Sequence, residues 1–227
     1  MNFLFTYIFS LNFILLVNSQ NHSINLKYYI PPKNIVLKYS IGDLNNDGIN
    51  DLVILSKENQ KNKYLDCLKY GLYTSDINTK FLSIYLYSCK QSKYILYKIL
   101  KNIIPVYSGY LYEELITNIS IENNKLNLNY FFGNNYYSWF TKEKTYTFEF
   151  LFDDFYLVKI KDFYQHRIHN YYTRIELDLK NHKKLIVKKI PPNINPVKIL
   201  LDLDSNYKFI KIMKIKPFKI LIDDSYY

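Results

Sequence analysis

The residues best suited to do chemistry lie in one short acidic segment, residues 41–55, which reads IGDLNNDGINDLVIL. Oxygen-bearing side chains stand at the first, third, fifth and ninth positions of its motif, and a glycine follows the third of them. This spacing lets a short loop turn oxygen atoms inward around a hard cation, and the backbone carbonyl at the seventh position adds another ligand. The segment therefore predicts a structural calcium site formed by Asp43, Asn45, Asp47, Asp51 and the carbonyl oxygen of Ile49.

Two other interpretations of this loop have to be weighed. A helix–loop–helix calcium hand needs an acidic residue at loop position twelve, where this chain has Ile54, and it needs flanking helices rather than alternating strand-like residues. A turn that binds no ion is the remaining alternative, since Asn and Gly favour turns by themselves. Three carboxylates in one loop repel one another unless a cation neutralises them, which favours calcium. Such a loop predicts weak affinity, about 0.1–1 mM, as in extracellular modules.

The rest of the chain is dominated by alternation of apolar and polar residues, which is typical of half-buried strands. We expect a mainly β fold: an antiparallel meander, a curled sheet, or a partial barrel or propeller-like arrangement, with one or two short helices. The best candidate for a helix is Tyr94 to Asn102. Strands on both sides of the acidic loop place the calcium site in a strand–strand turn. Three further hairpin turns are expected at residues 122–125, 153–154 and 180–183.

The N-terminus predicts export. Residues 1–19 are apolar, carry no charge and end in Val17-Asn18-Ser19, a small-residue pattern typical of signal-peptide cleavage. Export signals usually begin with positive charge, and no Lys or Arg stands near Met1. An uncleaved membrane anchor is the alternative. With cleavage we expect a periplasmic or secreted protein with no membrane span. Residues 20–190 would form one β domain that includes the loop 43–51, and residues 191–227 a C-terminal segment packed on the same domain.

The formal charge of +10 does not predict nucleic-acid binding. Arg167 and Arg174 are the only arginines among 30 basic residues, whereas phosphate recognition relies on the bidentate guanidinium group. The lysines alternate with apolar residues, as on the solvent face of strands. We therefore expect partners among envelope or extracellular proteins or glycans, with no nucleic acid.

Cys67 and Cys89 are the only cysteines. In an exported protein the pair favours one disulfide, and two unpaired thiols are the alternative.

Other candidate sites are weaker. His166 and His169 have a spacing that suits a metal, but no Glu or Cys accompanies them, so a packing role is favoured. No nucleophile elbow or phosphate-binding glycine loop is present, which predicts a protein without catalytic residues. The aromatic residues from Tyr136 to Phe140 suggest a strip on which a glycan or peptide stacks, with core packing as the alternative.

The acidic loop also carries a family resemblance. Its Asp-x-Asn-x-Asp-Gly-x-x-Asp pattern resembles the single FG-GAP/VCBS-type calcium loop of exported bacterial proteins. Further matching segments are residues 129–134, 138–139, 144–148 and 155–160, so that the resemblance covers about Ile35 to Ile160. It implies an exported β protein and carries over no catalytic residues. The expected function is non-catalytic interaction at the cell envelope; the alternative is a glycan- or peptide-binding module.

Overall fold

Strands make up nearly all of the regular structure. The structure is a computed structural model that describes residues 24–60, 64–66, 74–76, 78–101, 116–132, 140–166, 168–169, 171–189, 195–202 and 210–211. Within these ranges a short 3₁₀ helix, η1 (Leu26–Tyr29), precedes the strands β1 (Asn34–Gly42), β2 (Asp51–Glu58), β3 (Tyr64–Asp66), β4 (Thr74–Asp76), β5 (Lys80–Ser88), β6 (Lys93–Leu100), β7 (Ile116–Glu122), β8 (Lys125–Phe132), β9 (Phe140–Leu151), β10 (Asp154–His166), β11 (Tyr172–Asp178), β12 (Lys183–Lys189), β13 (Val197–Asp202) and β14 (Ile210–Lys211).

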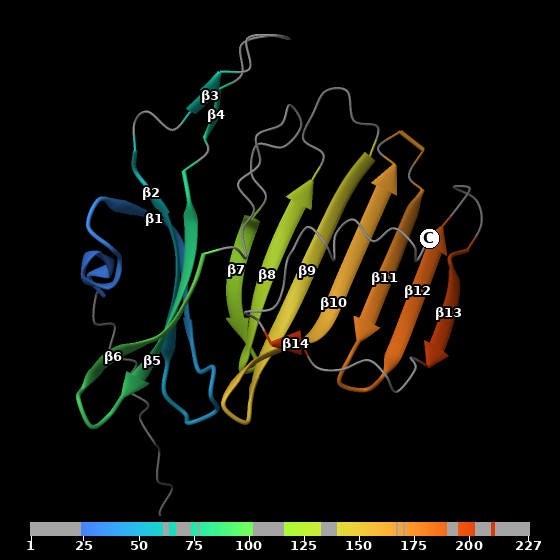
Figure 1. Ribbon diagram of the computed structural model, residues 1–227. Coiled ribbons are helices and arrows are strands. Elements are labelled where there is room, and N and C mark those ends of the chain that lie inside the picture. Colours follow the sequence, from blue (N-terminus) through green and yellow to red (C-terminus); the bar gives the residue numbers. More distant parts are fainter. Residues whose placement is uncertain are drawn as a thin grey trace, which may run out of the picture.

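The strands form two large antiparallel sheets (Figure 1). The first has four strands in the order β1-β2-β5-β6. The second is a meander in the order β7-β8-β9-β10-β11-β12-β13, with β14 paired to the start of β10, and β3 and β4 pair as a small separate ribbon. The C-terminal strands β13 and β14 thus belong to the same sheet as β10 and β12.

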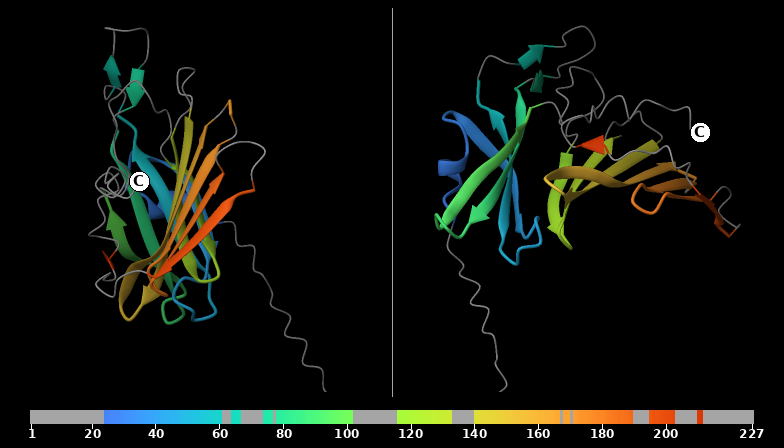
Figure 2. Two further views of the ribbon diagram at one scale, coloured as in Figure 1. Left: turned by 90° about the vertical axis from the view of Figure 1, so that its right-hand side faces the viewer. Right: turned by 60° about the horizontal axis from the view of Figure 1, so that its bottom comes forward.

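The two sheets share one core. β2 is buried along its length from Asp51 to Ser56 because both of its faces are covered. Val53 and Leu55 join a cluster with residues of β7 to β10. On the opposite face, Leu52 and Ile54 pack beneath η1. Figures 1 and 2 show the four-stranded sheet at the β7 end of the larger sheet, with β13 at the end farthest from it.

Aromatic and charged contacts lock the sheets together at β6. The Tyr97 ring packs edge-on against Phe150 and Phe155, with centroid distances of 5.7 and 5.8 Å. The Tyr97 hydroxyl donates a hydrogen bond of 2.5 Å to the Asp153 carbonyl. Beside it, Lys98 forms an ion pair with Asp154, and both side chains are largely buried. One pair of adjacent β6 residues therefore fixes the β9–β10 hairpin against the four-stranded sheet.

The expectation of a mainly antiparallel β fold is confirmed, with two corrections. Neither large sheet closes into a barrel. The helix expected over Tyr94 to Asn102 is wrong: its described part lies mostly in β6, which pairs with β5 from Leu82 to Ser88. The run is rich in aromatic and β-branched residues, and the available pairing edge of β5 decides in favour of strand.

All three expected hairpins are present, and two of their turns lie one residue earlier than expected. Asn123 and Asn124, with φ angles of 51° and 60°, form a two-residue turn between β7 and β8, as a tight hairpin requires. The turn between β11 and β12 spans residues 179–182, one residue earlier than expected, because Lys183 already belongs to β12. The β9–β10 turn comes one residue early, at Phe152 and Asp153, because Asp154 already belongs to β10.

Gly42 in β1 lies at a close approach of the two sheets. A β-carbon added there would lie 2.8 Å from the Cγ2 atom of Ile121 in β7. We expect Gly42→Ala to lower the free energy of unfolding by about 1–3 kcal/mol, as overpacking does. Chemical denaturation measures this loss. The second substitution Ile121→Ala removes the clashing methyl, so the Gly42→Ala effect should shrink in that background; an unchanged effect would contradict the clash.

Candidate functional site

The predicted calcium loop connects β1 to β2, as expected from the sequence. Two of its residues have left-handed backbone conformations: Asn46 with φ 61° and Gly48 with φ 82°. Asn and Gly are the residues that tolerate this region most readily.

Asp43 organises the loop from its first position. Its Oδ1 atom accepts hydrogen bonds from the backbone N–H groups of Asn46 (2.7 Å) and Asp47 (3.2 Å). Its Oδ2 atom accepts one from the N–H of Gly48, at 2.8 Å. The Asp43 carbonyl in turn accepts from the side-chain amide of Asn124, in the β7–β8 turn, at 3.2 Å. The loop is thereby curled around one carboxylate and attached to the neighbouring sheet.

Asn45 and Asp47 form the exposed rim of the loop. The Asn45 side-chain amide donates to Asp47 Oδ2 at 2.9 Å, and the Asp47 N–H donates to Asn45 Oδ1 at 3.2 Å. Asp47 Oδ1 accepts from the N–H of Ile49 at 2.8 Å. These contacts leave the carboxylate of Asp47 at the surface, where replacing its hydrogen-bond partners by others costs little free energy.

Asp51 is the buried member of the set, with no exposed surface. One carboxylate oxygen accepts from the N–H of Leu44 and the other from the N–H of Tyr87 in β5, each at 2.9 Å. Burial raises the pKa of Asp51; the two backbone hydrogen bonds lower it, and the charges of Asp47 and Asp43 raise it again. Asp51 therefore ties the loop to β5, a role that its sequence position does not reveal.

The donor chemistry of this loop suits a hard cation. Its carboxylates, one amide oxygen and the Ile49 carbonyl are the oxygen ligands that calcium prefers. A carboxylate oxygen that accepts a single N–H keeps a lone pair for a cation, as Asp43 Oδ2 and both oxygens of Asp51 do. In the described part of the chain, no three His, Cys, Asp or Glu side chains already converge on one point. The ligand set of Asp43, Asn45, Asp47, Ile49 and Asp51 stays a prediction.

The two histidines form a compact turn. The rings of His166 and His169 lie 4.7 Å apart, and His169 stacks on Tyr171 at 5.2 Å. His166 Nδ1 accepts the N–H groups of Ile168 and His169, each at 3.2 Å. That nitrogen therefore stabilises the backbone that follows the end of β10, which fits a structural role.

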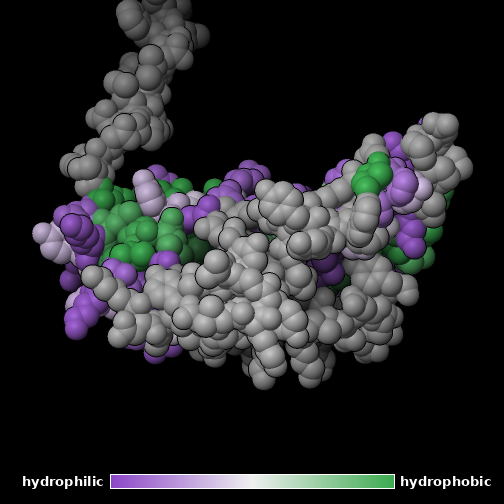
Figure 3. All heavy atoms as spheres, turned by 90° about the horizontal axis from the view of Figure 1, so that it is seen from above, coloured by the Kyte–Doolittle hydropathy of each residue, from purple (hydrophilic) through white to green (hydrophobic). Residues whose placement is uncertain are grey.

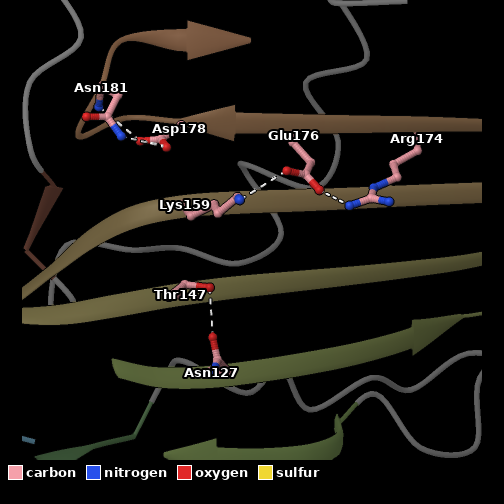
Figure 4. Close-up of polar contacts among 7 residues, drawn as sticks. All are labelled: Asn127, Thr147, Lys159, Arg174, Glu176, Asp178 and Asn181. Atoms are coloured by element: carbon pink, nitrogen blue, oxygen red, sulfur yellow. Dashed lines mark hydrogen bonds and ion pairs between the residues drawn. The ribbon is translucent and has the colours of Figure 1, made fainter. Parts of the chain in front are cut away.

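A second polar region lies on the face of the eight-stranded sheet that points away from the core (Figure 4). Glu176 of β11 receives a hydrogen bond from Arg174 and an ion pair from Lys159 of β10 at 3.0 Å. Partial burial by itself raises the pKa of Glu176, but the hydrogen bonds and charges of Arg174 and Lys159 outweigh it and lower the pKa. Thr147 and Asn127 continue the polar row across β9 and β8 with a hydrogen bond of 2.8 Å.

This face contains a shallow groove of about 420 Å³ over β9, β10 and β11. Aromatic Phe163 and Tyr172, with ring centroids 5.8 Å apart, lie among charged side chains. Sequence reasoning missed this region, because its residues come from three strands and no motif links them. The lining consists of Glu143, Thr145, Lys161, Asp162, Phe163, Tyr172 and Arg174.

Several predicted features lie outside the described residues. These are the signal segment of residues 1–19, Cys67, and most of the aromatic strip from Tyr136 to Phe140. Of that strip only Phe140, the first residue of β9, is described. Cys89 is exposed in the turn between β5 and β6.

Searching the described residues for a helix long and apolar enough to cross a membrane finds none. Comparison with protein-family models, with curated proteins and with solved structures gives no match to this chain.

Proposed function

We propose that this chain is an exported β protein that acts by non-catalytic binding at the cell envelope and that calcium stabilises its β1–β2 loop. The observation that carries the proposal is the loop itself: three carboxylates and an amide stand within nine residues, and the carboxylates of Asp43 and Asp51 both accept backbone N–H groups of this loop. Like charges within one short loop favour a bound cation. Asp43, Asn45, Asp47 and Asp51 would hold the ion together with the Ile49 carbonyl.

Bound calcium would neutralise the loop and hold its two ends together. The loop rests on the core through Leu44, which is 1% exposed, and on β5 through Asp51. A stiffer loop would therefore fix the orientation of the β1–β2 hairpin relative to β5 and to the shared core. The role we assign to the ion is stability and orientation of this end of the molecule, with an envelope or extracellular protein or glycan as the partner.

Thermal unfolding in about 2 mM calcium against excess chelator tests this proposal. We expect calcium to raise the stability of the protein by about 1 kcal/mol at several-fold saturation, visible as a higher midpoint. Asp47→Asn should abolish the calcium response and leave the fold intact, because Asp47 lies at the exposed rim. Asp153→Asn is the matched control, since it removes an exposed carboxylate from another β-turn. Equal midpoints with calcium and chelator in the folded wild type would refute calcium binding.

A glycan- or peptide-binding module is the second candidate, and the groove between β9 and β11 favours it. Phe163 and Tyr172 offer ring faces for stacking, and Lys161 and Arg174 offer hydrogen-bond donors around them. A glycan or peptide array probed with the wild type and with Phe163→Ala distinguishes the two. Binding that survives the substitution would exclude this groove.

A further inference from the structure

The outer edge of β13 differs from those of β1, β6 and β7, the strands at the other ends of the two large sheets. All six residues of β13 are exposed, including Val197 (56%), Ile199 (41%), Leu200 (63%) and Leu201 (45%). β13 is the strand farthest from the four-stranded sheet in Figure 1, and Figure 3 shows small apolar patches beside hydrophilic ones at this end of the molecule. Among the described residues, no strand pairs with its outer side. An apolar strand with a free edge is a template for pairing with another strand.

The strands at the other three ends of the two strand orders, β1, β6 and β7, are interrupted. The pairing of β1 with β2 skips Leu37, that of β6 with β5 skips Tyr97, and that of β7 with β8 skips Thr117. An extra residue of this kind bends the strand and disrupts its free edge, which discourages edge-to-edge association. β7 is also occupied on its outer side, where Ile121 N–H donates to Ser40 Oγ of β1 at 3.0 Å. β13 pairs with β12 in unbroken register from Val197 to Asp202, so its edge is straight.

The sequence of β13 is complementary to itself. Lys198, Leu200 and Asp202 share one face of the strand, because side chains alternate between faces. In an antiparallel pair of two copies centred on Leu200, each Lys198 lies opposite the other copy's Asp202, and the two Leu200 side chains meet. On the other face, Ile199 lies opposite Leu201. Centring the pair on Ile199 instead would set Lys198 against Leu200 and leave both charges without a counterpart, so the charges select the first register.

The neighbouring strand extends this match. Leu185 of β12 lies beside Leu200, so the pair would align four leucines across the two copies. Lys183 of β12 lies 3.7 Å from Asp202, which is 88% exposed. The second copy's Lys198 would approach that carboxylate from its open side. We propose that two copies of this chain associate through their β13 edges, antiparallel and centred on Leu200, and join their large sheets into one.

An interface of six residues a side is small, so this dimer is expected to be weak, with a dissociation constant on the order of 10–100 μM. Sedimentation equilibrium of the full chain from about 5 μM to 1 mM measures it. The wild type should shift from one to two chain masses across this range. Lys198→Asp and Asp202→Lys each set like charges opposite one another and should each stay monomeric. Mixed in equal amounts, the two variants restore both ion pairs and should dimerise.

Far-UV circular dichroism checks that the variants are folded, which their exposed positions favour. Should either charge variant not fold, Leu200→Lys serves in its place and should also remain monomeric. Phe152→Lys is the control, since it changes a side chain that is 90% exposed in a distant turn, and it should dimerise like the wild type. A wild type that is monomeric at about 1 mM would overturn the proposal. So would single charge variants that dimerise as well as the wild type, because the contact would then lie elsewhere.

Discussion

Phe155→Ala should lower the free energy of unfolding by about 3–5 kcal/mol, the range found when a fully buried aromatic side chain is deleted from a core. Phe155 has no exposed surface and belongs to the core that both sheets share. Its ring packs against Phe150 at 5.1 Å and Tyr97 at 5.8 Å, so its removal opens a cavity where β6 meets the β9–β10 hairpin. Urea denaturation followed by tyrosine fluorescence measures the loss.

Phe152→Ala is the matched control for this prediction. Phe152 is the same residue type, stands three positions earlier and is 90% exposed. Surface substitutions of this kind change stability by about 0.5 kcal/mol or less. If both variants lost the same stability, the shared core would not be what holds the two sheets together.

Asp51→Ala should lower the free energy of unfolding in chelator by about 2–4 kcal/mol, because two backbone N–H groups lose their acceptor in a buried region. Those donors belong to Leu44 and Tyr87, so the loop and β5 are affected together. Burial raises the pKa of Asp51, which means that burying its negative charge costs free energy. The substitution removes this cost, which offsets part of the loss. Amide hydrogen exchange should show faster exchange at both N–H groups, and chemical denaturation gives the magnitude.

Asp47→Ala provides the contrast within the same loop. Asp47 accepts from Ile49 and Asn45 at the exposed rim, so its loss in chelator should cost about 0.5–1 kcal/mol or less. Both variants should lose the response to calcium. If Asp47→Ala lowered the free energy of unfolding in chelator as much as Asp51→Ala, this would contradict the distinction between a rim carboxylate and a buried one.

The local parts of the fold could be predicted because their causes are local. The Asn123-Asn124 turn follows from two residues that tolerate positive φ between alternating segments, and the acidic loop follows from the spacing of its oxygens. The β9–β10 turn shifts by one residue because Asp154 is drawn into β10, where Lys98 of the other sheet pairs with it. That contact joins residues 56 positions apart, which no local pattern reveals.

Non-local pairing explains what the sequence could not indicate. The segment from Tyr94 is short and apolar, and such runs suit a helix or a strand until a partner is known; β5 is that partner. Asp51 stands in a ligand motif, but its bond to Tyr87 depends on β2 pairing with β5, which the β3–β4 ribbon separates in sequence. The groove residues likewise come together only because β9, β10 and β11 are neighbours.

Isothermal titration of calcium into the full chain tests the central claim most directly. We expect one calcium per chain, a dissociation constant of about 0.1–1 mM, and no binding by Asp47→Asn that is otherwise folded like the wild type. Magnesium should bind more weakly, because it requires a tighter octahedral arrangement of ligands. A folded wild type that takes up no calcium at millimolar concentration would contradict the account and reduce the loop to a turn that connects β1 and β2.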